Sequence, residues 1–213
     1  MKISPLIIVQ KAYFYVFVLV LSLSSQVYGN PSNRILVLGD SISAGYGLPQ
    51  GTGWVSLLND SLKVSQYSFE INNASISGDT TAGGKQRLVK LINQYRPNIL
   101  ILELGANDAL RGFPIESSAQ NLEEMIQLAQ KQKIKVLLLG MKVPSNYGQE
   151  YTQKFSQMYF IIAKKTRSSL VPFLLEDVAS QRELFQEDGI HPNQQAQKIL
   201  LKNVLPQLKL LLH

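Results

Sequence analysis

The chain contains no cysteine, and only two of its 213 residues are histidine, His191 and the C-terminal His213. The absence of cysteine excludes a disulfide scaffold, a zinc-thiolate or iron–sulfur site, a cysteine nucleophile and a CxxC redox pair. With two histidines, a metal centre built from several imidazoles is excluded as well. Any histidine-assisted catalysis must therefore use His191, since His213 is the last residue of the chain.

Charged residues are also scarce, at 17% of the chain, while apolar residues make up 45%. This composition is typical of a folded globular protein and is too apolar for a disordered one. The formal net charge of +6 comes from single Lys and Arg residues rather than from blocks. It is too weak and scattered to indicate nucleic-acid binding. Two interpretations remain, transient contact with an anionic lipid surface or, as we prefer, an ordinary solvated surface.

The N-terminal thirty residues differ from the rest because they contain no acid. Two lysines, Lys2 and Lys11, precede the apolar run Ala12–Leu23, and small and polar residues follow up to Gly29. A basic start, a short apolar middle and a small-residue end are the parts of a secretory signal peptide. The apolar run would span about 18 Å as a helix, less than the ~30 Å of a bilayer core. We therefore expect residues 1–29 to be removed on export.

An uncleaved membrane anchor is the alternative. It would have to extend the apolar run backward across Lys11 to include Leu6–Val9.

From residue 34 onward, short apolar runs alternate with segments whose apolar residues recur at helical spacing. Five runs predict strands, and the fifth contains Pro172, which is typical of an edge strand or a strand end. We expect the last helix to be kinked or restarted at Pro206. Alternating strands and helices predict an α/β fold, a three-layer α/β/α sandwich with a mainly parallel five-stranded sheet. The predicted strands are 35–38, 67–71, 99–102, 136–139 and 170–174, all within one domain, 30–213.

In such a sheet, functional groups gather beyond the carboxyl ends of the strands. Ser41 follows the first strand in the segment GDSISAGYG, where it is either an exposed nucleophile or an ordinary helix N-cap. His191 lies near the C-terminus in DGIHPN, and Pro192 disfavours helical backbone at His191. Asp188 precedes His191 by three residues, so its carboxylate can accept from one ring nitrogen and leave the other free as a base. We expect Asp40 to brace the turn rather than to orient the histidine.

A glycine-rich loop follows the second strand but does not match a phosphate-binding loop. In an alignment to GxxxxGK[ST], Asp79 occupies the first glycine position and Gln86 the Ser/Thr position. Kinase or NTPase activity is therefore disfavoured. The backbone N–H of Gly78 in this loop and the amide of Asn107, which follows the third strand, could instead join the Ser41 N–H in an oxyanion hole.

Four segments together, GDSISAGYG, NASISGDTTAGG, GANDALRG and DGIHPN, resemble the Ser, Gly, Asn and His blocks of the SGNH (GDSL) hydrolases. Within that family, NASISGDT, LRGF and DGIHPN resemble the multifunctional acyl-CoA thioesterase, protease and lysophospholipase group and its arylesterase relatives. The resemblance implies Ser41 as nucleophile, Asp188 and His191 as the rest of a triad, and Gly78 and Asn107 as oxyanion-hole donors. It also implies a periplasmic or secreted enzyme without metal or cofactor.

The implied substrates are carboxylic esters and thioesters, including acyl-CoA-type thioesters, lysophospholipids and aryl esters. A narrower carbohydrate acetyl-esterase and a non-catalytic lipid- or surface-binding protein are the alternatives. We expect a monomer. Residues 48–53 depart from the family pattern and leave the local fit to substrate open. The candidates for an apolar acyl groove are the large side chains near the four blocks: Tyr46, Leu48, Ile76, Leu110, Phe113, Val143 and Tyr147.

Overall fold

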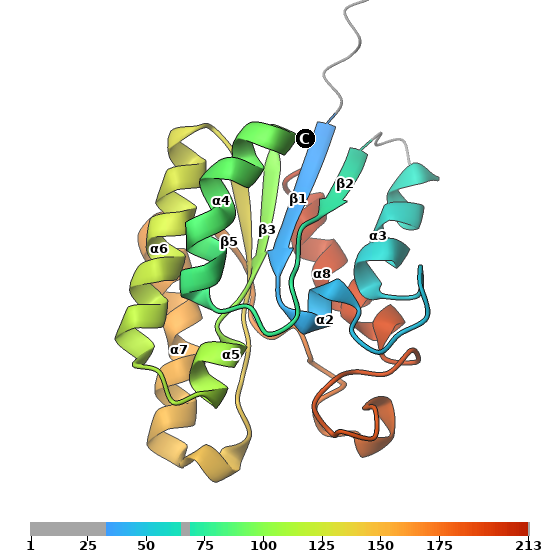
Figure 1. The fold of residues 1–213 in the computed structure, drawn as a ribbon, viewed down its shortest axis with the longest axis vertical. Coiled ribbons are helices and arrows are strands. Elements are labelled where there is room, and N and C mark those ends of the chain that lie inside the picture. The colour runs from blue at the N-terminus through green and yellow to red at the C-terminus, as the bar shows by residue number, and fades with distance from the viewer. Residues whose placement is uncertain (1–32, 65–68, 213) are drawn as a thin grey trace, which may run out of the picture. The chain divides into compact units, whose positions relative to one another are not determined.

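A computed structural model describes residues 33–64 and 69–212, so the predicted signal peptide, 1–29, lies outside the described residues. The described residues form one parallel five-stranded sheet in the order β2-β1-β3-β4-β5 (Figure 1). The strands are β1 (Asn33–Gly39), β2 (Phe69–Asn73), β3 (Ile99–Glu103), β4 (Lys135–Leu139) and β5 (Ser169–Val171).

The central strands are buried from both sides, which explains why they are almost continuously apolar. In β1, the side chains from Ile35 to Leu38 are fully buried. The prediction placed the second strand at 67–71, whereas β2 runs to Asn73. The fifth strand was predicted to reach residue 174 but ends at Val171, since Pro172 has no N–H to continue the ladder.

Helices cover both faces of the sheet and make the predicted three-layer sandwich. On one face α3 packs against α8, and on the other α6 lies between α4 and α7 (Figure 1). The ranges are α3 (Trp54–Lys63), α4 (Thr81–Tyr95), α6 (Ile115–Lys131), α7 (Gln149–Thr166) and α8 (Gln197–Lys209). Four one-turn segments lie in the loops: α2 (Ser41–Ala44), α5 (Ala106–Leu110), η1 (Ser145–Tyr147) and η2 (Arg182–Leu184).

The last helix does not restart at Pro206, because α8 continues through this residue to Lys209. The buried side chains Leu200, Val204 and Leu208 recur along one face of α8. Their burial holds the helix on the domain even though proline removes one backbone hydrogen bond. None of the helices in the described part of the chain is long and apolar enough to cross a membrane.

Candidate active site

The carboxyl ends of all strands lie at one edge of the sheet, because the strands are parallel. Gly39 at the end of β1 is paired with Glu103 at the end of β3, and Val37 is paired with Asn73 at the end of β2. The segments that follow these strands therefore begin side by side. An apolar cavity also opens at this edge.

Ser41 is the first residue of the short helix α2, directly after the β1 turn. Asp40 caps this helix, and its Oδ1 accepts a hydrogen bond from the Ile42 N–H at 3.0 Å. Asp40 therefore braces the turn, as the sequence indicated. Gly39 permits a tight approach here, since a Cβ at this position would lie 2.7 Å from Glu103 Oε2.

His191 lies next to Ser41, although 150 positions separate them in the chain. Its Nε2 is 2.9 Å from Ser41 Oγ, and its Nδ1 is 2.7 Å from Asp188 Oδ2. The other Asp188 oxygen accepts the N–H groups of Ile190 and His191, at 2.8 and 3.0 Å. Partial desolvation raises the pKa of Asp188, but the hydrogen bonds from His191 and Ile190 outweigh it and lower this pKa to about 2. Asp188 is thus anionic at neutral pH and holds the imidazole with a free nitrogen toward Ser41.

Contacts on either side hold the His191 loop against the Ser41 loop. Gln186 donates from Nε2 to the Tyr46 carbonyl at 2.8 Å, and the Tyr46 ring lies 4.6 Å from the imidazole, centroid to centroid. The buried Gln197 accepts the Trp54 N–H at 3.0 Å and donates to backbone carbonyls of the His191 loop. The position of His191 relative to Ser41 is therefore set by carboxamide side chains from the same loop and from α8.

Two of the predicted oxyanion donors are backbone groups with no competing partner. Within the described residues, neither the Ser41 N–H nor the Gly78 N–H donates a hydrogen bond. Gly78 has a φ of +77°, a conformation that glycine adopts without strain. Arg111 donates to the Gly78 carbonyl at 2.9 Å and thereby helps to orient this peptide group.

The third predicted donor, Asn107, is the second residue of α5. Its Nδ2 donates one hydrogen bond to Asp40 Oδ2 at 3.0 Å, which leaves the second N–H of the amide for a substrate oxygen. The next residue, Asp108, is buried and accepts both the N–H and the hydroxyl of Thr81, at 2.9 and 2.5 Å. Because Thr81 lies just beyond Gly78, Asp108 links the loops that carry Gly78 and Asn107.

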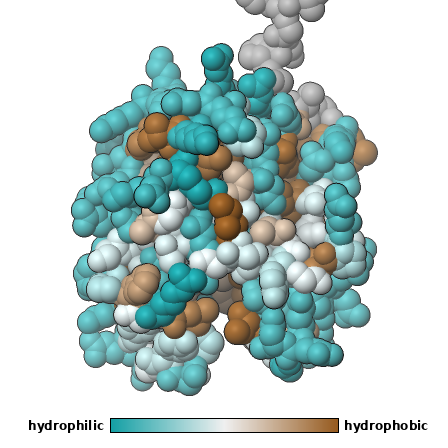
Figure 2. Space-filling model, viewed as in Figure 1, coloured by the Kyte–Doolittle hydropathy of each residue, from teal (hydrophilic) through white to brown (hydrophobic). Residues whose placement is uncertain are grey.

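An apolar cavity of about 500 Å³ is lined by Ile42 and Ile190, the sequence neighbours of Ser41 and His191, although neither catalytic side chain lines it. Figure 2 shows hydrophobic side chains beside a hollow in the lower half of the molecule, where Figure 1 places α5 and the strand ends. Of the predicted groove residues, the structure places Leu110 and Val143 in this cavity. The other five do not line it: Tyr46, Leu48, Ile76, Phe113 and Tyr147.

Sequence reasoning missed other lining residues, among them Met141, Phe173 and Phe185. Met141 and Phe173 follow the ends of β4 and β5, so the rule that selected Ser41 and Asn107 could have found them. Phe185 carried no such signal, because it lies in a loop beyond the last strand.

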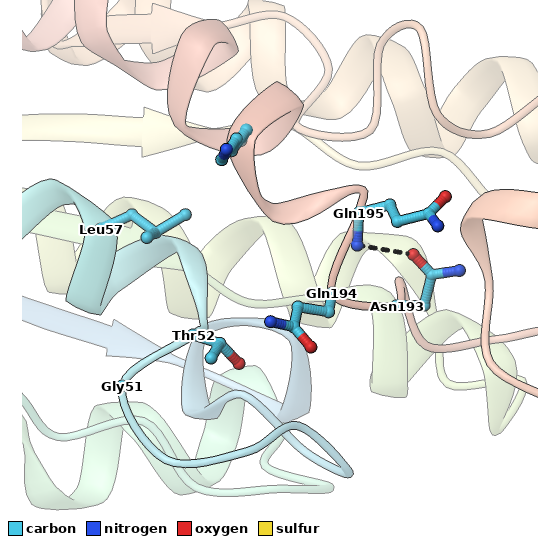
Figure 3. A pocket seen from close by; sticks show the side chains of 7 residues that line it. Gly51, Thr52, Leu57, Asn193, Gln194 and Gln195 are labelled. Carbon is cyan, nitrogen blue, oxygen red and sulfur yellow. Dashed lines mark hydrogen bonds between the residues drawn. The ribbon is translucent and has the colours of Figure 1, made fainter.

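A second hollow, of about 720 Å³, lies between the segment before α3 and the start of α8 (Figure 3). Three of its lining residues, Asn193, Gln194 and Gln195, carry amide side chains, and Asn193 Oδ1 accepts the Gln195 N–H at 2.9 Å. Its lining residues are Gly51, Thr52, Leu57, Asn193, Gln194, Gln195 and Lys198, so neither Ser41 nor His191 contributes to it.

Comparison with known proteins identifies the family. Residues 37–199 match the model of the GDSL-like Lipase/Acylhydrolase family. The chain belongs to this family. It is 48% identical to "Esterase TesA" of Pseudomonas aeruginosa over 85% of this chain and 90% of that one. It is 39% identical to "Thioesterase 1/protease 1/lysophospholipase L1" of Escherichia coli K12 over 84% of each chain.

Its fold is also similar to a solved structure of TesA, with a TM-score of 0.82 and 47% identity over 84% of this chain and 99% of that one. The protein is accordingly a GDSL-family enzyme that hydrolyses ester bonds. The structure brings Ser41, His191 and Asp188 into hydrogen-bond contact and holds Asn107 on Asp40, the residue before Ser41. Gly78 contacts Arg111, which follows the helix of Asn107.

Proposed function

We propose that Ser41 is the nucleophile of an exported esterase that hydrolyses carboxylic esters and thioesters through an acyl-enzyme. The observation that carries the proposal is the chain of contacts Ser41 Oγ–His191 Nε2 at 2.9 Å and His191 Nδ1–Asp188 Oδ2 at 2.7 Å. This order of hydroxyl, imidazole and carboxylate is the arrangement that activates a serine.

In the first half-reaction, His191 takes the Ser41 proton while Oγ forms a bond to the substrate carbonyl carbon. The Asp188 carboxylate stabilises the imidazolium that results. The N–H groups of Ser41 and Gly78 and the free N–H of Asn107 stabilise the oxyanion. The C–O or C–S bond then breaks, and His191 delivers its proton to the leaving oxygen or sulfur.

In the second half-reaction, water attacks the acyl-enzyme and His191 accepts its proton. A second tetrahedral intermediate then collapses, and the proton returns to Ser41 Oγ as the carboxylic acid is released. The imidazole thus acts once as base and once as acid in each half.

The apolar cavity beside Ser41 supports substrates with an extended acyl chain. At about 500 Å³ it is far larger than an acetyl group needs, and Met141, Phe173 and Leu175 make part of its wall apolar. The relative from Escherichia coli is named as a thioesterase and lysophospholipase. We therefore propose acyl thioesters and lysophospholipids alongside simple esters as substrates, and we propose that the protein acts as a monomer.

Residues 1–29 provide the route of export in this proposal, with the mature enzyme in the periplasm or outside the cell. N-terminal sequencing of the protein recovered from that compartment is expected to begin near residue 30. An intact N-terminus in the membrane fraction would instead support an uncleaved anchor.

Hydrolysis of p-nitrophenyl esters from acetyl to palmitoyl tests the catalytic proposal. Ser41→Ala and His191→Ala should abolish turnover of medium and long chains, whereas Ser117→Ala, at an exposed serine of α6, should leave it unchanged. Ser41→Ala should also lose labelling by a fluorophosphonate. Retained turnover or labelling in Ser41→Ala would refute the nucleophile, and activity confined to acetyl esters would favour the carbohydrate acetyl-esterase.

A further inference from the structure

A buried acid lies behind the predicted oxyanion hole and has no part in the mechanism above. Glu103 ends β3, and none of its surface is exposed. Its Oε2 accepts two hydrogen bonds, from the Asp40 N–H at 3.2 Å and from the Ser43 hydroxyl at 2.7 Å. Its Oε1 is also buried and has no donor among the described residues. A carboxylate here would leave a charged oxygen without solvation, which is strongly unfavourable.

If Glu103 carries a proton, the Asp40 side chain supplies the hydrogen-bond acceptor that Glu103 needs. The two residues are in contact, because the Asp40 N–H donates to Glu103 Oε2 at 3.2 Å, and two neighbouring carboxyl groups favour sharing one proton. Burial raises both pKa values, that of Asp40 to about 6 and that of Glu103 well above its usual range. Both Asp40 oxygens accept hydrogen bonds, from the Ile42 N–H and from Asn107 Nδ2, whereas Glu103 Oε1 accepts none, so the proton resides on Glu103.

Asp40 in turn contacts the catalytic groups. Its Oδ2 accepts from Asn107 Nδ2 at 3.0 Å, and its Oδ1 accepts the Ile42 N–H. An anionic Asp40 only accepts hydrogen bonds, so it must face the nitrogen of the Asn107 amide and not its oxygen. A protonated Asp40 could donate a hydrogen bond instead, which would permit the Asn107 amide to flip and turn its oxygen toward Asp40. An ionised Glu103, by contrast, would place a second negative charge close to where the oxyanion develops.

We propose that Glu103 is a positioning residue that acts as a neutral carboxylic acid, donating its proton to Asp40 and thereby keeping Asp40 as the acceptor for Asn107. The inference rests on the proposed function, because Asn107 matters here as an oxyanion donor. Other titratable groups also face this pair. His191 and Asp79 act on the charge of Asp40, and the buried hydroxyl of Tyr159, which donates to the Leu104 carbonyl, lies near Glu103.

Two substitutions distinguish the effect of the Glu103 proton from the effect of the size of the Glu103 side chain. Glu103→Gln keeps an oxygen for the Asp40 N–H and the Ser43 hydroxyl and keeps an N–H for the Asp40 carboxylate, so it mimics the protonated acid. Glu103→Leu removes all three interactions at similar size. We expect Glu103→Gln to retain kcat within about threefold, and Glu103→Leu to lose about 10²-fold in kcat with little change in KM, since misplacing an oxyanion donor approaches the cost of losing it.

Glu124→Gln is the matched control, because Glu124 is a surface residue paired with Lys85. It should leave kcat and KM unchanged. A Glu103→Leu enzyme with normal kcat, or a Glu103→Gln enzyme as impaired as Glu103→Leu, would overturn the proposal.

NMR of the wild-type protein labelled with ¹³C at its glutamate carboxyl carbons tests the protonation directly, even if Glu103→Leu does not fold. One signal should remain at the position of a carboxylic acid through neutral pH and be absent from Glu103→Gln. Titration of every glutamate in the ordinary acidic range would refute the inference. This measurement does not depend on turnover, so it distinguishes failure here from failure of Ser41→Ala to abolish activity.

Discussion

Replacing Asp188 by asparagine should disable the base without displacing it. The asparagine oxygen can keep the bonds that Asp188 Oδ1 receives from the Ile190 and His191 N–H groups, at 2.8 and 3.0 Å, so the loop conformation is preserved. Its NH₂ group then occupies the Oδ2 position, 2.7 Å from His191 Nδ1. Since an amide NH₂ only donates, Nδ1 must accept and the ring proton moves to Nε2, which faces Ser41 Oγ at 2.9 Å. Nε2 then has no lone pair with which to accept the serine proton.

The expected loss in kcat is about 10⁴-fold, the scale of a wrong histidine tautomer in a serine triad. This factor corresponds to about 5.4 kcal/mol in activation free energy. The effect on folding should be far smaller. Because the Asp188 side chain is 36% exposed and screened by solvent, we expect a loss of about 1 kcal/mol in unfolding free energy, or ~2–4 °C in Tm.

Stopped-flow turnover of p-nitrophenyl butyrate and thermal unfolding monitored by circular dichroism measure the two effects. Asp60→Asn, which removes an exposed carboxylate paired with Lys63 on α3, is the control and should match the wild type in both. An Asp188→Asn enzyme that unfolds normally and retains kcat within tenfold of the wild type would refute the reasoning.

The pH dependence of stability provides a second check on Asp188. Its folded-state pKa of about 2 lies below the ordinary value of 3.8, so its contribution to stability is present above about pH 4 and is lost as the pH falls toward 2. The wild-type minus Asp188→Asn difference in unfolding free energy should shrink over that window. A difference that stays constant from pH 5 to pH 2 would show that the charge of Asp188 does not stabilise the folded state.

Two further substitutions test the loop contacts and the cavity. Gln186→Ala removes the 2.8 Å hydrogen bond to the Tyr46 carbonyl. We expect kcat to fall about tenfold with KM nearly unchanged, since a small displacement of a catalytic group is costly. An unchanged kcat would show that the ring contact between Tyr46 and His191 suffices to position the imidazole. Val143→Trp fills part of the 500 Å³ cavity and should lower kcat/KM for palmitoyl esters at least tenfold more than for butyryl esters. Equal losses for both chain lengths would place the acyl chain elsewhere.

Local chemistry made several features predictable from the sequence. The run Ile35–Leu38 is apolar at every position, as a strand buried on both faces must be. The Asp188–His191 contact spans three residues and needs only a tight turn, so DGIHPN by itself indicates it. Ser41 and Asn107 were found because each follows a strand, and parallel strands bring such positions to one edge.

Interactions between distant segments had to come from the tertiary structure. The 2.9 Å contact between Ser41 and His191 depends on how the His191 loop is held by Gln186 and Gln197, and no local pattern encodes that distance. The sequence likewise placed Glu103 only directly after the predicted third strand, 99–102. Its pairing with Asp40 appears once β1 and β3 lie side by side.

The apolar cavity shows most clearly which features the sequence predicts and which only the tertiary structure decides. Apolar loop residues near the catalytic blocks are easily listed from the sequence, but only packing decides which of them share a wall. Leu110 and Val143 line the cavity, whereas Ile76, Phe113 and Tyr147 are exposed elsewhere on the surface. The fold and the reacting groups could thus be predicted from hydrophobic periodicity and from position at strand ends, because both of these signals are local in the sequence. The cavity and the protonation of the buried acid depend on surfaces that meet only in the folded domain.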